Sequence, residues 1–262
     1  MKPSEHIKPA HIDGLVTERQ KRILDLLVED PGISVVEISM RLKVTDATIR
    51  NDLNHLTSGG LVVRTRGKAV LALHPNMIAR QGLNIREKVR IARKAAQMIQ
   101  SGDTVFIDSS TTTSMIPRYL LGKRDIHIIT NSLLPIPSIR LNPAVRFTML
   151  GGDFRLLDEC FVGPLALDAI KRFNARYAFI GTIGFSAASG VTASSLDIAE
   201  VIRQMAKCAD TAVLCADTSK CDKKGNANTI SINELDCLII DEKVEKTFQE
   251  QIAEQGVKVI TV

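Results

Sequence analysis

Between residues 17 and 74, the hydrophobic positions repeat with the period of three short helices. Each run begins directly after a residue whose hydroxyl can cap a helix, and these residues are Thr17, Ser34 and Thr45. The third run places three apolar side chains on one inward face: Ile49, Leu53 and Leu56. Two β-rich runs around a polar turn follow and predict a hairpin. Three short helices and a hairpin are the parts of a winged helix-turn-helix.

From residue 104 onward, the pattern changes to short apolar strands that alternate with helices. The predicted strands span residues 104–108, 126–130, 145–150, 177–181, 211–217, 237–241 and 257–262. The helices predicted between them span residues 113–121, 132–141, 164–173, 195–208 and 243–255. This alternation is typical of an α/β domain with a largely parallel sheet. Such sheets bind ligands at the carboxyl ends of their strands.

The two patterns divide the chain into four segments. They are a polar N-terminal tail (1–16), a winged helix-turn-helix DNA-binding domain (17–74), a linker (75–84) and an α/β effector-sensing and oligomerisation domain (85–262). The length of 262 residues fits one large or two moderate domains. The N-terminus lacks the apolar core of a signal peptide, and no window is apolar enough for a membrane span. We therefore expect a cytoplasmic protein without a membrane partner.

The five cysteines indicate neither disulfides nor a metal site. They are odd in number, no pair has Cys-x-x-Cys spacing, and the five histidines do not gather near them. We expect reduced thiols, no metal and no cofactor. The cysteines are Cys160, Cys208, Cys215, Cys221 and Cys237.

Positive charge is concentrated in the predicted helix-turn-helix. The net charge is +5, and between Arg41 and Lys68 six basic residues face only two acids, Asp46 and Asp52. Clustered Lys and Arg neutralise phosphates, while Arg, Asn and Thr at the outward end of a recognition helix can read bases. We assign structural roles to the two acids. The predicted DNA contacts are Thr45, Thr48, Arg50, Asn51, Arg64, Arg66 and Lys68.

Several predicted strands of the α/β domain end in small, hydroxyl or amide side chains. The first leads into five consecutive Ser and Thr residues, 109–113, and the second into Asn131-Ser132. Gly151-Gly152 with Arg155 follows the third, and Thr218-Ser219-Lys220 follows the strand at 211–217. Ordinary helix capping explains any one of these ends. Together they favour a pocket for a phosphorylated, polyhydroxylated small molecule.

The sequence of the third helix resembles the DeoR/GlpR family of bacterial sugar-metabolism regulators. The likeness rests on residues 47–53 (Ala-Thr-Ile-Arg-Asn-Asp-Leu), with Leu56, Gly60 and Leu61 downstream. Asn51 stands where a second Arg is common in the family. Residues 66–68 (Arg-Gly-Lys) replace a His-Gly-Gly turn in the wing. Both departures concern the operator sequence rather than DNA binding.

The resemblance continues through the α/β half. It implies a sensor domain that resembles the ribose-phosphate isomerase fold and binds a sugar phosphate. The carboxylates of Asp108 and Glu200 are expected, from their chemistry, to accept sugar hydroxyls. The implied effector-binding residues are Lys88, Asp108, Ser110, Thr111, Thr112, Asn131, Gly152, Arg155, Glu200 and Lys220. Ser110 occupies a position where the family usually has glycine.

Three functions remain open from the sequence. The first is a repressor of a carbohydrate operon, which binds double-stranded operator DNA as a dimer or tetramer under control of the effector. The second is a sugar-phosphate isomerase fused to a DNA-binding domain. In the isomerases that this fold resembles, an acid-rich run occupies the position of residues 180–184, which here read Ile-Gly-Thr-Ile-Gly, so we predict no catalytic residues. The third is an α/β domain that only oligomerises.

Overall fold

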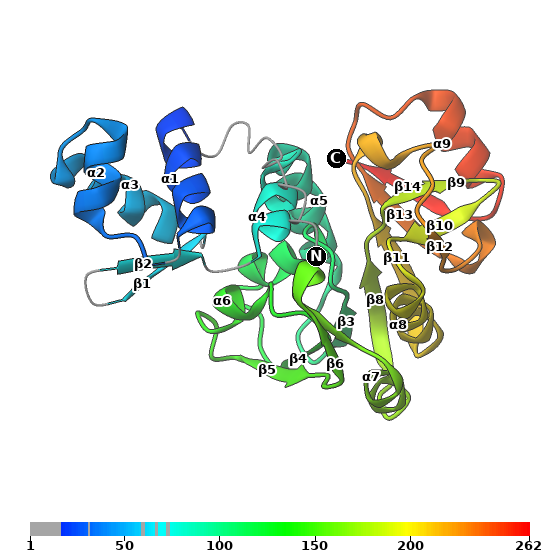
Figure 1. The fold of residues 1–262 in the computed structure, drawn as a ribbon. Coiled ribbons are helices and arrows are strands. Elements are labelled where there is room, and N and C mark those ends of the chain that lie inside the picture. The colour runs from blue at the N-terminus through cyan, green and yellow to red at the C-terminus, as the bar shows by residue number, and fades with distance from the viewer. Residues whose placement is uncertain (1–16, 31, 59–60, 66–67, 72–73) are drawn as a thin grey trace, which may run out of the picture. The chain divides into compact units, whose positions relative to one another are not determined.

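A seven-stranded parallel sheet organises the larger of the two units into which the chain folds (Figure 1). The computed structural model describes residues 17–30, 32–58, 61–65, 68–71 and 74–262. One unit runs to Ile85, and the other begins at Arg86.

The N-terminal unit contains the predicted three helices and hairpin. Its elements are α1 (Glu18–Glu29), α2 (Val35–Leu42), α3 (Asp46–Ser58), β1 (Val62–Thr65), β2 (Lys68–Leu71) and α4 (Pro75–Gly82). Capping boxes begin α1 and α2, at Thr17 and Ser34. Ile49, Leu53 and Leu56 of α3 are buried in one apolar core with α1 and α2. The helical periodicity therefore gave the right elements here.

Helix α4 lies in the segment 75–84, which the sequence pattern predicts to be a linker. Pro75 occupies its first turn, where a missing N–H costs nothing, and His74 Nδ1 accepts a hydrogen bond from the Asn76 N–H at 3.2 Å. Met77 is fully buried, and Ile78 belongs to the core of the N-terminal unit. The apolar side chains of this segment account for its order.

The C-terminal unit alternates strands with helices throughout. Its helices are α5 (Ile85–Met98), α6 (Ile136–Ile139), α7 (Pro164–Ile170), α8 (Leu196–Lys207) and α9 (Lys246–Ala253). Its 3₁₀ helices are η1 (Thr113–Tyr119), η2 (Leu156–Asp158), η3 (Thr218–Lys220) and η4 (Ile232–Glu234). Its main-sheet strands are β3 (Thr104–Ile107), β4 (Ile126–Thr130), β5 (Val145–Met149), β8 (Ala175–Ile180), β11 (Ala209–Cys215), β13 (Cys237–Ile240) and β14 (Lys258–Thr261).

The main sheet has the order β14-β13-β11-β8-β3-β4-β5, and all of its neighbours are parallel. All seven predicted strands are present, so the predicted α/β class is confirmed. Pro117 lies inside η1, where the sequence predicted an ordinary helix, and the missing N–H of proline disfavours a regular helix there. The helix predicted at 132–141 is shortened to α6.

Five short strands were not predicted. They are β6 (Asp153–Arg155), β7 (Cys160–Val162), β9 (Gly184–Ser186), β10 (Gly190–Ala193) and β12 (Ala227–Asn228). The first two form an antiparallel hairpin, and the other three form a small sheet of order β12-β10-β9. Each has at most four residues, which is too short for an alternation pattern to stand out.

Candidate functional site

Helix α3 exposes its N-terminal end in the N-terminal unit. Thr45, Arg50 and Asn51 are exposed, while Ile49 on the opposite face is completely buried. Thr45 Oγ1 caps the helix by accepting a hydrogen bond from the Thr48 N–H at 3.2 Å. Base-reading side chain types therefore stand on the solvent side of a helix whose other side is fixed by the core.

The two acids near this surface are bound within the chain. Asp52 is almost fully buried and accepts hydrogen bonds from Arg19 Nε at 2.5 Å and Gln20 Nε2 at 3.2 Å. The bond to Asp52 raises the pKa of Arg19. Asp46 accepts a hydrogen bond from Ser39 Oγ at 2.6 Å. Both contacts agree with the structural roles assigned to these acids.

The hairpin of β1 and β2 carries the predicted wing residues. Arg64 is exposed, and its Nη1 donates to Asn54 Oδ1 of α3 at 2.7 Å, which ties the wing to the recognition helix. Lys68 is the first residue of β2. Arg66 lies outside the described residues. The DNA contacts of these residues stay predictions.

At the carboxyl end of β3, Asp108 anchors the hydroxyl-rich loop. Its Oδ1 accepts hydrogen bonds from Thr113 Oγ1 at 2.6 Å and the Ser110 N–H at 3.1 Å, and its Oδ2 accepts from the Gly181 N–H of the neighbouring strand end at 2.8 Å. Asp108 is 2% exposed, and burial raises its pKa. Both carboxylate oxygens thus shape the loop that follows β3.

Ser110 and Gly181 meet closely where β3 and β8 end. A Cβ atom on Gly181 would lie 2.3 Å from Ser110 Cβ, so only glycine fits opposite this serine. Ser110 Oγ accepts a hydrogen bond from the Thr113 N–H at 3.2 Å. Thr111 and Thr112 are buried beside it. Gly181, directly after the neighbouring strand β8, therefore leaves the space that the side chain of Ser110 occupies.

At the end of β4, Asn131 is fully buried. Its Nδ2 donates to the Phe161 carbonyl oxygen at 2.8 Å, but its Oδ1 accepts no hydrogen bond within the described part of the chain. A buried acceptor without a donor is costly, and a bound ligand can supply the donor. The predicted effector residue thus carries unused hydrogen-bonding capacity.

The hairpin of β6 and β7 joins the ends of β3 and β4. Cys160 of β7 bridges to Ser132 and contacts Ser109, and burial raises the pKa of its thiol to about 11. Cys160 also pairs with Arg155 of β6. The predicted residues Asp108, Asn131 and Arg155 are therefore grouped around one buried thiol.

Arg155 and Gly152 have roles within the chain. The guanidinium of Arg155 forms ion pairs with Asp158 at 3.3 Å and with Asp197, in the first turn of α8, at 3.2 Å. Gly152 has φ of +142°, and a Cβ atom there would lie 2.3 Å from the Val162 carbonyl oxygen. Strand β7 is therefore the segment that lies close to Gly152 and leaves no room for a Cβ atom.

Two predicted lysines belong to the other side of the same sheet edge. Lys220 ends η3, whose Thr218 N–H donates to Asp241 Oδ2 at 2.6 Å. Lys88 is 4% exposed in the first turn of α5. That turn is bound at the end of β13 by the pair of Glu87 with Lys243 at 2.6 Å. From β4 to β11 the edge spans three strand spacings, roughly 14 Å.

The ion pair of Glu200 is made outside this group, and two buried hydroxyls were not among the predicted effector contacts. Glu200 pairs with Arg203, which also donates to carbonyl oxygens beside β12. Ser195 Oγ, at the start of α8, and Thr218 Oγ1 are buried without a partner among the described residues. Ser195 occupies the N-cap position of α8, which the sequence could have indicated, but its side chain makes no capping hydrogen bond. Burial of these hydroxyls could not be read from the sequence.

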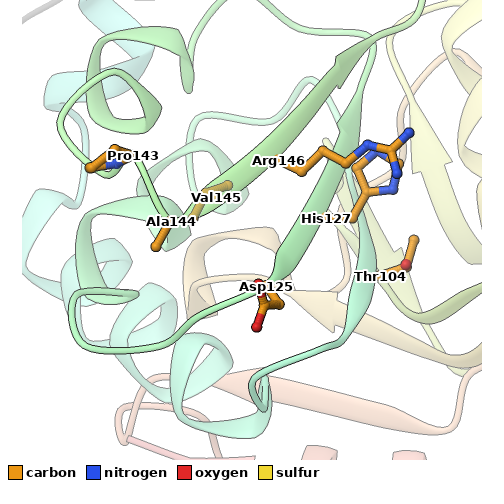
Figure 2. Close-up of a pocket in the computed structure, with 7 residues that line it drawn as sticks. All are labelled: Thr104, Asp125, His127, Pro143, Ala144, Val145 and Arg146. Carbon is orange, nitrogen blue, oxygen red and sulfur yellow. The ribbon is translucent and has the colours of Figure 1, made fainter.

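An open depression of about 550 Å³ lies at the opposite, amino end of the sheet and contains none of the predicted residues (Figure 2). Figure 2 shows His127 and Arg146 side by side on its wall. The side chain of His127 is held by a hydrogen bond to Thr148 Oγ1 at 2.7 Å.

Three observations concern metals, disulfides and membranes. Among the described residues, no three His, Cys, Asp or Glu side chains are grouped to hold a metal ion. All five cysteines are free thiols. No described helix is both long and apolar enough to cross a membrane.

Comparison with known proteins identifies both units. Residues 19–73 match the DeoR-like helix-turn-helix domain, and residues 83–242 match the DeoR C terminal sensor domain. The regulator GlpR of Haloferax volcanii is 32% identical, over 94% of this chain and 98% of its own. The glycerol-3-phosphate regulon repressor of Escherichia coli (strain K12) is 28% identical, over 86% and 90%.

Among solved structures, the ribose 5-phosphate isomerase of Methanocaldococcus jannaschii is 14% identical, with a TM-score of 0.39 over 53% of this chain and 55% of that one. The family models together span both units of the chain. The chain belongs to the DeoR family, with the helix-turn-helix domain and the sensor domain of that family in one polypeptide.

Proposed function

We propose that this chain is a transcriptional repressor of a carbohydrate transport or catabolism operon, controlled by a phosphorylated sugar. Its relatives are named as regulators and repressors, one of them of a glycerol-3-phosphate regulon. The observation that carries the DNA-binding half is the exposed end of α3, where Arg50 and Asn51 face solvent. The protein acts on double-stranded operator DNA in the cytoplasm, without a membrane partner.

The effector binds across the carboxyl edge of the main sheet. The observation that carries this step is the unused hydrogen-bonding capacity there, at Asn131 Oδ1 and Thr218 Oγ1. Lys88 and Lys220 lie at the β11–β13 side of the edge and supply positive charge for a phosphate. Asp108 holds the loop of Ser110 at the carboxyl end of β3.

Catalysis is not part of this proposal. Gly181, Thr182 and Ile183 follow strand β8, so the residues after this strand supply no carboxylate of their own to remove a proton next to a carbonyl. Asp108 is committed to three hydrogen bonds within the chain. Turnover of ribose 5-phosphate by the purified protein would contradict this assignment and favour the isomerase alternative.

The DNA-binding half is tested by fluorescence anisotropy with the intergenic DNA upstream of the gene. We expect Arg50→Ala to lower operator affinity by about 1–3 kcal/mol, because an Arg–guanine pair is lost. The matched control is Arg140→Ala, which removes the same charge from an exposed position of the C-terminal unit. Equal affinity of Arg50→Ala and the control for the operator would refute the assigned surface.

The effector half is tested by calorimetry with a panel of sugar phosphates and the corresponding free sugars. We expect one phosphorylated member to bind and to change operator affinity. Thr218→Val keeps the side-chain volume but removes a hydroxyl that has no partner within the described chain, so folding stability is retained while effector affinity falls. Thr247→Val, at an exposed position in α9, is the control. Binding that is unaffected by Thr218→Val would place the effector elsewhere.

A further inference from the structure

Five large apolar side chains are exposed on one part of the C-terminal unit, which we name the hairpin surface. Between 45% and 73% of each side chain is accessible to water, although large apolar groups are normally buried. They come from β6, η2 and the first turns of α7 and α8. The five residues are Phe154, Leu156, Leu157, Leu165 and Leu196.

Contacts within the chain hold these elements next to one another. The pair of Arg155 with Asp197 joins the end of β6 to the first turn of α8. A Cβ atom on Gly163 would lie 2.5 Å from Asp153 Oδ2, so the start of α7 adjoins the start of β6. The rings of Phe154 and Phe161 pack with centroids 5.2 Å apart. Exposed large apolar side chains on neighbouring elements are typical of an interaction site.

Strand β6 also has an open edge, since β7 is its only paired neighbour among the described strands. Phe161, opposite Phe154, uses both main-chain groups on the other side, because its N–H donates to the Asn131 carbonyl oxygen and its own carbonyl oxygen accepts from Asn131 Nδ2. Phe154 and Phe161 are therefore a non-hydrogen-bonded antiparallel pair, in which the main-chain N–H and C=O of each residue point away from the partner strand. The N–H and C=O of Phe154 are therefore directed to the open edge.

The sequence of β6, Asp-Phe-Arg, is complementary to itself when two copies run antiparallel. With Phe154 opposite Phe154, Asp153 of each copy faces Arg155 of the other. Within the described chain, the Asp153 carboxylate accepts no hydrogen bond, and Arg155 donates through Nε and Nη1 but not through Nη2. Donors and acceptors are thus available on both sides of the two-fold axis.

We propose that a second copy of this chain docks on the hairpin surface by pairing β6 with β6 about a two-fold axis. The main-chain groups of the two Phe154 residues exchange two hydrogen bonds, and the two charge pairs flank them. The symmetry doubles the apolar contribution, because each copy provides the same five side chains. The same contact covers the open edge of β6 and the exposed apolar side chains of the hairpin surface. This proposal does not depend on DNA or effector binding.

Sedimentation equilibrium of the full-length protein tests the association. We expect wild type to form dimers or multiples of dimers, and we expect Leu165→Glu to weaken the dimer at least about tenfold, because a charge is buried at the interface. Leu165 is 73% exposed in the single chain, so its replacement leaves the fold intact. Leu141→Glu is the matched control, since Leu141 is 79% exposed outside the hairpin surface. A monomeric wild type would overturn the proposal.

A cysteine cross-link tests the register. In a hydrogen-bonded antiparallel pair the two Cα atoms lie about 5.5 Å apart, within the range of a disulfide. The variant Phe154→Cys, treated with a mild oxidant, should therefore form covalent dimers faster than wild type and faster than Leu141→Cys. The wild type controls for cross-links through the native cysteines. An oligomer that resists Leu165→Glu and leaves Phe154→Cys uncross-linked would place the interface on another face and overturn the proposal.

Discussion

At the scale of single residues, the candidate effector site is shaped by contacts between neighbouring strand ends. Asp108 uses both carboxylate oxygens to hold its own loop and the Gly181 N–H. Asn131 is anchored through Nδ2 and retains a free acceptor within the described chain. Residue types and their positions after strands were readable from the sequence. Which atoms were already satisfied was not, because that depends on strand order and on the unpredicted β6–β7 hairpin.

The pair of Ser110 and Gly181 gives a prediction for stability. Gly181→Ala places a Cβ atom 2.3 Å from Ser110 Cβ, so we expect the free energy of unfolding to fall by about 1–3 kcal/mol. Ser110→Gly removes the obstructing atoms. In that background, Gly181→Ala should cost distinctly less, as measured by urea denaturation and a double-mutant cycle. Additive effects of the two changes would mean that the contact does not limit this position.

His127 gives a prediction for pH dependence. Burial, with a smaller contribution from the Arg146 charge, lowers its pKa below the ordinary value of 6.5. Just below that value the unfolded chain binds a proton that the folded chain does not, so the free energy of unfolding should fall as the pH falls through this window. NMR titration should find the low pKa, and Arg146→Gln should raise it. An unchanged pKa in that variant would argue against the influence of Arg146.

At the scale of elements, the long patterns were predictable and the short ones were not. The main-sheet strands are runs of Val, Ile and other apolar residues, so their pattern persists over most of each strand. Strand β6 consists of Asp, Phe and Arg, and it is a strand only because β7 pairs with it. Helix α4 was missed since its apolar side chains follow a proline that suggested a linker. Tertiary contacts decide such short elements.

Helix α5 and the end of β13 are joined by two ion pairs, which give the next prediction. Glu87 pairs with Lys243 at 2.6 Å, and Arg90 pairs with Glu242 at 2.9 Å. The hydrogen bond from Lys243 lowers the pKa of Glu87 in the folded chain. The stability that this pair contributes is therefore fully present above pH 4.5, the ordinary pKa of a glutamate, and is lost as the pH falls through the pKa of Glu87 in the folded chain. A double-mutant cycle of Glu87→Gln and Lys243→Met should give a small favourable coupling at pH 7, since Lys243 is exposed to solvent. A coupling that persists in full well below pH 4 would contradict the charge pairing.

At the scale of the whole molecule, the chain combines two units of one family, and the sequence was sufficient to recognise both. The motif of α3 and the hydroxyl-rich strand ends carried that recognition. The site at the sheet edge follows from topology, because parallel strands bring residues from distant parts of the chain to one side. The sequence predicted an oligomer but not its surface, since the hairpin that contains β6 was not predicted.

Salt dependence is the prediction that belongs to this scale. The logarithm of operator affinity should fall linearly with the logarithm of salt concentration, because binding releases counterions from the DNA. Arg64→Ala should reduce the magnitude of the slope by about 1 for each DNA-binding domain that contacts the operator, as expected for one lost phosphate contact. Arg64 is exposed and bonds only to Asn54 within the described chain, so folding should be little affected. An unchanged slope would remove Arg64 from the phosphate contacts.

The order of strands in the main sheet also bears on how the protein is made. Val105 of β3 pairs with Tyr177 of β8, so the centre of the sheet cannot close until the intervening chain has emerged from the ribosome. The N-terminal unit relies on contacts between neighbouring segments, and such topologies fold fast. A nascent chain should therefore display a folded helix-turn-helix before its regulatory half exists. Any operator contact made at that stage would escape metabolic control.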